Sequence, residues 1–103
     1  MRVRDVTTTG VVYLELLRGF TRASTRAEIH QHFDAVHFVE PTRGDYSEAA
    51  DLSRTCRQSG VQLGTIDALI AQICIANDLM LLTADADFVH AAKHIPLNFM
   101  AVA

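Results

Sequence analysis

A chain of 103 residues, half of them hydrophobic and a fifth charged, is enough for one soluble globular domain and too short for two. The net charge of −3 counts against a module that only binds nucleic acid, because such modules usually carry a basic excess, but it does not exclude an enzyme that cuts nucleic acid. No apolar run approaches the roughly 18 residues of a membrane span, and no apolar segment follows the charged start as it would in a signal peptide. We therefore expect a single cytoplasmic domain over residues 1–103, with Cys56 and Cys74 reduced in or near its core.

Strands and helices are predicted to alternate along the first forty residues. Residues 5–9 have strand-type side chains, and the dense apolar stretch 11–20 predicts a helix that is buried on most sides. Thr25 starts a capping box, which predicts a helix over 25–34. A short strand is expected over 35–39, before a proline that disfavours helix.

The same alternation continues to the C-terminus. Asp45 and Glu48 repeat the capping pattern and predict a helix that ends at Gly60. Thr65 is predicted to cap the next helix. By helical spacing, its buried face should consist of Ile66, Leu69, Ile70, Ile73 and Cys74. The remaining elements are a strand, a helix and a second strand, expected over 80–83, 87–94 and 97–102.

This order of elements predicts an α/β fold in which a mostly parallel sheet carries helices on both faces, as a three-layer sandwich. In such sheets the ligand site lies beyond the carboxyl ends of the strands. Residues that carry chemistry are therefore expected just after strands and at the starts of the helices that follow them.

Four acidic residues stand at positions that need an explanation. Glu15 interrupts an otherwise apolar helix, and Asp67 lies in the first turn of a later one. Asp85 and Asp87 directly follow a predicted strand. Each has a simpler explanation when taken alone. Glu15 could pair with Arg18, Asp67 could favour the positive end of its helix, and Asp85 could be a helix N-cap.

Parallel topology brings these acids to one side of the sheet, where they would repel one another and raise their own pKa values. A hard divalent cation removes that cost, and carboxylate and water ligands suit Mg²⁺ or Mn²⁺. Such a site can activate a water molecule and neutralise the charge of a phosphodiester. Taken together, the acids predict a metal-dependent site for phosphodiester hydrolysis.

Three segments, in order, resemble the later acidic motifs of PIN-type nuclease domains of the VapC toxin kind. They are 12–19 (VYLELLRG), 64–71 (GTIDALIA) and 81–88 (LLTADADF). The resemblance covers nearly the whole chain. It implies a metal-dependent endonuclease that cleaves RNA, often the toxin of a pair that a small antitoxin protein silences.

The resemblance also assigns roles to individual residues. It implies that Glu15, Asp67 and Asp85 are metal-site acids that take part in catalysis. It implies that Asp87 is an auxiliary catalytic acid and that Thr83 is a nearby hydroxyl at the substrate.

The family's first motif, a hydrophobic strand that ends in Asp at the extreme N-terminus, has no counterpart before Glu15. Asp5 lies in the segment that leads into the Glu15 helix, and we do not assign it that role. Because the first strand is central in PIN sheets, we expect its place to be filled by rearranged pairing, most simply in an intimate or domain-swapped homodimer. An alternative prediction is an inactive PIN remnant that binds an antitoxin or a second chain. A phospho-acceptor domain of the flavodoxin-like type is a third, disfavoured because its acids would lie on early strands.

The basic residues give weaker indications. Arg18, Arg22 and Arg26 recur every fourth residue and could hold RNA phosphates, although a solvated face explains the same spacing. His90 and His94 are four residues apart but lack the HExxH pattern, so zinc is not expected.

Overall fold

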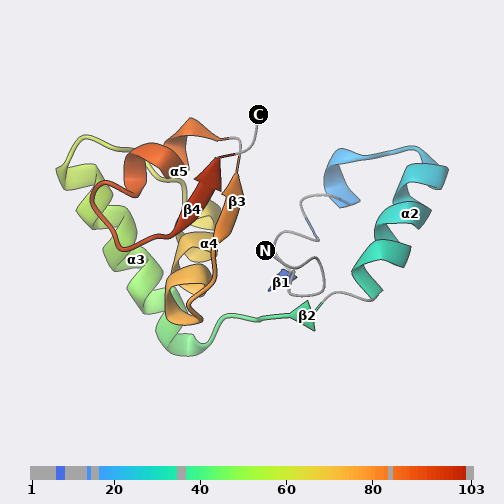
Figure 1. Cartoon of the computed structure of the whole chain (residues 1–103), viewed down its shortest axis with the longest axis horizontal. Coiled ribbons are helices and arrows are strands. Elements are labelled where there is room, and N and C mark those ends of the chain that lie inside the picture. Colours follow the sequence, from blue (N-terminus) through green and yellow to red (C-terminus); the bar gives the residue numbers. More distant parts are fainter. Residues whose placement is uncertain (1–6, 9–13, 15–16, 35–36, 84, 102–103) are drawn as a thin grey trace. The chain divides into compact units, whose positions relative to one another are not determined.

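The computed structural model describes residues 7–8, 14, 17–34, 37–83 and 85–101 (Figure 1). The chain forms two compact units, Met1–Glu40 and Pro41–Ala103. Each unit has its own pair of parallel strands together with helices. The predicted α/β class with parallel strands is therefore confirmed.

The first unit contains strand β1 (Thr7–Thr8), helix α2 (Ala23–Asp34) and strand β2 (His37–Phe38). β1 and β2 pair in parallel, with Thr7 opposite His37. Parallel strands need a crossover between them, and α2 lies in that connection. Both strands fall inside the ranges predicted from the sequence.

The helix predicted over 11–20 is present at Leu14 and at residues 17–19, but the prediction that it is buried on most sides is wrong for its described residues. Leu14 is 64% exposed and Phe20 is 46% exposed. Apolar composition predicted burial, yet none of residues 14, 17–34 and 38–40 is buried. Apolar composition alone does not decide burial, because a side chain is enclosed only where enough neighbours surround it.

Helix α2 begins two residues before the predicted capping box. The Arg26 N–H donates to the Arg22 carbonyl at 3.0 Å, so the helical bonding pattern has already begun when the chain reaches Thr25. Thr25 therefore lies inside α2, and the prediction that it starts the helix is wrong. The predicted end at Asp34 is confirmed.

The second unit contains helices α3 (Arg43–Gln58), α4 (Thr65–Ala76) and α5 (Ala86–Ala91), and strands β3 (Leu81–Thr83) and β4 (Phe99–Ala101). β3 and β4 pair in parallel, α3 packs against α4, and α5 contacts β4 (Figure 1). The predicted order of elements is confirmed. The last helix ends three residues before the predicted boundary, since residues 92–94 form a turn.

Both long helices of this unit begin at residues other than the predicted caps. Thr42 is the N-cap of α3: its Oγ1 accepts from the Asp45 N–H at 3.2 Å, and Asp45 Oδ2 accepts from the Thr42 N–H at 2.8 Å. The capping box therefore lies three residues earlier than predicted, with Glu48 outside it. Gly64 is the N-cap of α4, so Thr65 is already helical and the prediction that it caps this helix is wrong.

Helix α3 ends at Gln58, two residues before the predicted end, and the chain turns at Gly60. Gly60 has a φ of +81°, a left-handed conformation that a residue without Cβ adopts at no steric cost. The next N–H, that of Val61, returns to the Cys56 carbonyl at 2.8 Å and so satisfies a carbonyl of the last turn. This closed end turns the chain back toward α4.

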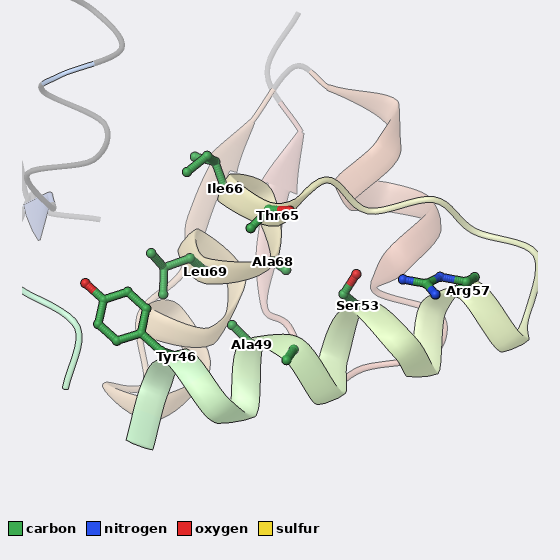
Figure 2. Close-up of a pocket in the computed structure, with 9 residues that line it drawn as sticks. Tyr46, Ala49, Ser53, Arg57, Thr65, Ile66, Ala68 and Leu69 are labelled. Carbon is green, nitrogen blue, oxygen red and sulfur yellow. The ribbon is translucent and has the colours of Figure 1, made fainter. Parts of the chain in front are cut away.

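The buried apolar side chains of the described residues all belong to the second unit. They are Ala49, Cys56, Leu63, Ala68, Leu69, Ile70, Ala71, Ile73, Cys74, Phe88, Ala91, Ile95 and Leu97. The predicted core face of α4 is confirmed except at Ile66, which is 42% exposed. That part of the prediction is wrong because Ile66 lines an open hollow between α3 and α4 (Figure 2).

The two cysteines are free and buried, as predicted. Burial raises the pKa of the Cys56 thiol and of the Cys74 thiol. Because the thiolate is the reactive form, both side chains behave as small apolar core residues at neutral pH.

Candidate active site

The end of β3 and the start of α5 form a hydrogen-bonded turn that carries three of the predicted site residues. Thr83, the last residue of β3, is buried, and its Oγ1 accepts from the Asp85 N–H at 3.0 Å. Asp85 caps α5, because its Oδ1 accepts from the Asp87 N–H at 2.8 Å. The cap occupies one carboxylate oxygen of Asp85, and both aspartates are exposed. The turn therefore presents carboxylate oxygens to solvent directly beyond the strand.

Asp67 approaches this region from α4. It is half-buried in the first turn, and its carboxylate lies over the start of the helix, since a Cβ added at Gly64 would lie 4.0 Å from Asp67 Oδ2. Helix α4 runs opposite to β3, and only residues 77–80 join the two (Figure 1). The first turn of α4 and the last residue of β3 therefore lie toward the same end of the unit. This is the carboxyl end of the strands, where open α/β sheets bind their ligands.

The metal site predicted from the sequence is described only in part. Among them, no three His, Cys, Asp or Glu side chains lie close enough together to hold a metal ion. Glu15 lies outside the described residues, so its predicted role stays a prediction. The donor chemistry fits Mg²⁺ or Mn²⁺, since Asp67, Asp85 and Asp87 offer hard carboxylate oxygens and magnesium is often held by one or two carboxylates and several waters.

The three arginines that recur every fourth residue differ in their surroundings. Arg18 and Arg22 are exposed. Arg26 is half-buried, and its Nη1 donates to the carbonyls of Leu17 and of Phe20, the latter at 3.3 Å. The guanidinium of Arg26 thus stabilises the end of the helical segment before α2. Arg18 and Arg22 remain the candidates for contact with phosphate.

A buried polar contact between α3 and α4 escaped the sequence-based prediction. Gln72 is 3% exposed, and its Nε2 donates to Glu48 Oε2 at 2.9 Å and to Asp45 Oδ1 at 3.3 Å. The pKa of Asp45 is lowered, mainly by the hydrogen bond from the Thr42 backbone; burial opposes this, and the Gln72 bond adds to it. The sequence did contain an indication of this contact, because Gln72 is a polar residue within the apolar run ALIAQICIA. Glu15 interrupts the apolar run VVYLELL in the same way.

The fold and these side chains define a class: a parallel α/β protein with carboxylates that follow the carboxyl end of a strand. The sequence matches the PIN domain family over residues 1–94, and the chain belongs to this family. The predicted family is therefore confirmed. Among curated proteins, none matches the sequence significantly.

Three solved structures show the same fold. A chain of VapBC-5 from Mycobacterium tuberculosis, a member of the VapBC family of toxin–antitoxin systems, is 20% identical and superposes with a TM-score of 0.74, covering 94% of this chain and 82% of that one. A chain of VapBC-1 from nontypeable Haemophilus influenzae is 17% identical, with a TM-score of 0.74 and coverage of 93% and 73%. A chain of VapBC2 from Rickettsia felis, bound to a DNA fragment from its promoter, is 19% identical, with a TM-score of 0.71 and coverage of 92% and 73%.

Proposed function

We propose that this chain is a Mg²⁺- or Mn²⁺-dependent endoribonuclease, the toxin of a toxin–antitoxin pair. The observation that carries the proposal is the position of Asp67, Asp85 and Asp87 toward the carboxyl end of β3 in a chain of the PIN domain family. PIN domains are nuclease domains, and carboxylates at this edge are what a hydrolytic metal site needs.

In this proposal Glu15, Asp67 and Asp85 hold the metal, directly or through water, and Asp87 orients a bound water or completes the site. When bound, the metal supplies an activated water and neutralises charge on the phosphodiester. Thr83 fixes the Asp85 backbone through its hydroxyl, which supports a positioning role beside its predicted place at the substrate. The exposed guanidinium groups that would hold RNA phosphates are those of Arg18 and Arg22.

The proposed partners are an RNA substrate, a cognate antitoxin protein and a second copy of the chain. The antitoxin is supported by the toxin–antitoxin complexes that share this fold. A cytoplasmic location is also part of the proposal, and the two unpaired thiols support a reducing compartment. None of the described helices has the length and apolarity that crossing a membrane requires.

One observation favours a second candidate function. Since the described residues do not bring three metal-binding side chains together, the chain could be a catalytically inactive PIN domain that only binds its partner. This candidate and the first differ in whether the pure protein hydrolyses RNA.

The deciding experiment measures RNA cleavage by the pure protein with Mg²⁺, with Mn²⁺ and with chelator, together with calorimetric Mn²⁺ binding. We expect metal-dependent cleavage that is lost in Asp67→Asn, with weaker Mn²⁺ binding and a stability change no larger than a capping effect of about 1–2 kcal/mol. Asp78→Asn is the matched control, because Asp78 is exposed and its φ of 53° is one that Asn also tolerates.

The contrary results are distinct. No cleavage by the wild-type chain with either metal would favour the inactive candidate. Unchanged Mn²⁺ affinity in Asp67→Asn, with a stability loss beyond the capping effect, would make Asp67 a structural residue.

A further inference from the structure

The side chain of Arg26 reaches back from α2 to the helical segment that precedes it. Its Nη1 donates to the carbonyls of Leu17 and of Phe20, which lie nine and six residues earlier in the chain. The Arg26 backbone is fixed near the start of α2, where its N–H donates to the Arg22 carbonyl at 3.0 Å. The guanidinium therefore connects the start of one helix to the end of another across a link of three residues, 20–22.

The two acceptors are carbonyls at the end of a helical segment, where a helix has no N–H donors of its own to bond them. The partial negative charge at that end also favours a cation. A guanidinium suits this position because it offers several N–H donors in a rigid plane and keeps its charge. Two bonds from one planar group restrict the angle between the segment and α2 more than a single bond would.

Core packing adds little to this restriction in the described part of the segment and of α2. Leu14 is 64% exposed, Phe20 is 46% exposed, and none of residues 14 and 17–34 is buried. A segment with few buried apolar contacts is displaced at low cost, so the hydrogen bonds to its end have a large effect on its position. The bonds from Arg26 are therefore expected to control where this segment lies.

We propose that Arg26 is a positioning residue for the metal site: by holding the end of this helical segment, it holds the carboxylate of Glu15 in place for the metal. Glu15 lies two positions before Leu17 in the sequence, so a shift of the Leu17 backbone is passed on to Glu15 through the chain. This role rests on the proposed function, which assigns Glu15 to the metal. It belongs to a residue that contacts neither the metal nor RNA.

The spacing that groups Arg26 with Arg18 and Arg22 does not give the three residues the same role. Arg18 and Arg22 are exposed, whereas Arg26 is half-buried and its guanidinium bonds backbone carbonyls. Residues that orient a metal ligand typically change metal affinity by roughly 10- to 100-fold when they are removed. A phosphate contact would instead change the affinity for RNA and its dependence on salt. The two roles therefore differ in the quantity that they alter.

Calorimetric titration of the full chain with Mn²⁺, in the absence of RNA, measures the effect directly. We expect Arg26→Ala to raise the Mn²⁺ dissociation constant about tenfold, the lower end of the range above, because the Glu15 carboxylate is displaced and not removed. Arg26→Lys should have a smaller effect, because an ammonium keeps the charge but lacks the planar set of donors.

Phe33→Leu is the matched control for a loosened α2. Phe33 lies at the other end of this helix, where its ring contacts that of Phe38 with the centroids 6.0 Å apart. The substitution weakens the attachment of α2 without touching the carbonyls that Arg26 bonds. This variant should bind Mn²⁺ as the wild type does.

A double-mutant cycle shows whether Arg26 acts through Glu15. When Glu15→Gln is present in both chains, Arg26→Ala should change Mn²⁺ affinity by less than about twofold, because the ligand that Arg26 positions has already been lost. A residue that merely supports the fold would weaken binding in either background. Cleavage gives a second readout, since the Mn²⁺ concentration for half-maximal rate should rise in Arg26→Ala and saturating Mn²⁺ should restore most of the rate.

The contrary outcomes separate this role from the proposed function. A wild-type chain that binds no Mn²⁺, or a Glu15→Gln variant that binds it as tightly as the wild type, would overturn the assignment of Glu15 to the metal and the role of Arg26 with it. Unchanged affinity in Arg26→Ala, beside a weakened Glu15→Gln, would overturn the role of Arg26 alone. An equal loss in Phe33→Leu, or in both backgrounds of the cycle, would do the same. If Arg26→Ala does not fold, Arg26→Lys takes its place in the cycle, and a loss of affinity below about twofold would then count against the role.

Discussion

At the scale of single residues, Asp45 links the start of α3 to α4. Its carboxylate accepts from the Thr42 N–H at 2.8 Å and from Gln72 Nε2 at 3.3 Å. These bonds hold its pKa below the ordinary range, so the folded chain binds fewer protons at this site than the unfolded chain. The carboxylate therefore stabilises the fold above the ordinary pKa of about 4. That contribution is lost as the pH falls through the lowered value.

We predict that Asp45→Asn lowers the free energy of unfolding at neutral pH by about 1 kcal/mol, the usual effect of losing a cap interaction. The variant should also lose part of the acid dependence of stability below about pH 4. Urea unfolding over a series of pH values measures both effects. Asp51→Asn is the control, because Asp51 makes an exposed contact with Arg54 at 3.8 Å that contributes little. Equal pH profiles for wild type and Asp45→Asn would contradict the prediction.

Single residues also show what the sequence could and could not predict about the site. The simpler explanation of Asp85, that it is a helix N-cap, is confirmed, because Asp directly before a helix has one dominant local bonding pattern; its predicted role at a metal stays a prediction. Gln72 has no such local pattern: its acceptors lie 24 and 27 residues away, and only the packing of α4 on α3 brings them together. The arrangement of Asp67 with the α5 turn is likewise a matter of packing, so spacing alone could not give it.

At the scale of elements, helices were easier to predict than the residues that begin them. The helical periods of α3 and α4 are set by many apolar residues, and both helices are where the sequence predicts them. Their starts depend on one or two side chains, and Thr42 and Asp45 offer the same capping spacing as Asp45 and Glu48. Of these two pairs, only Thr42 and Asp45 have their capping residue outside the helix. The sequence spacing is the same for both pairs and does not show this difference.

The arginines beside α2 give a prediction at this scale. Arg26 binds backbone carbonyls, whereas Arg18 and Arg22 are exposed. We expect the double change Arg18→Ala and Arg22→Ala to reduce the slope of log affinity for single-stranded RNA against log salt by up to about 1.4, from about 0.7 per phosphate contact. Arg26→Ala should leave the slope unchanged and lower the free energy of unfolding by about 1 kcal/mol.

Fluorescence anisotropy with labelled RNA measures the slope, with Asp67→Asn in every chain to prevent cleavage during the titration. An unaltered slope in the double variant would show that Arg18 and Arg22 are simply solvated. A reduced slope in Arg26→Ala alone would show that its guanidinium reaches RNA in addition to the carbonyls of Leu17 and Phe20.

At the scale of the whole molecule, the described core is distributed unequally. Every buried apolar residue in the described part of the chain belongs to Pro41–Ala103, and α4 alone contributes six of them together with the buried Gln72. Helix α2, of the same length as α4, has none. Composition could not predict this difference, because apolar residues are frequent in both halves of the sequence.

This distribution predicts how local stability varies along the chain. Opening a helix is costly where it exposes buried apolar surface and less costly where none of its residues is buried. Amide hydrogen exchange of the full chain should therefore be at least about tenfold slower in the middle of α4 than in the middle of α2. The comparison is well matched, since both helices are twelve residues long and carry intact backbone hydrogen bonds. Mass spectrometry of peptides from the two helices gives the rates. Equal protection of α2 and α4 would mean that α2 is covered in solution, and the exposure assigned to the first unit would then be wrong.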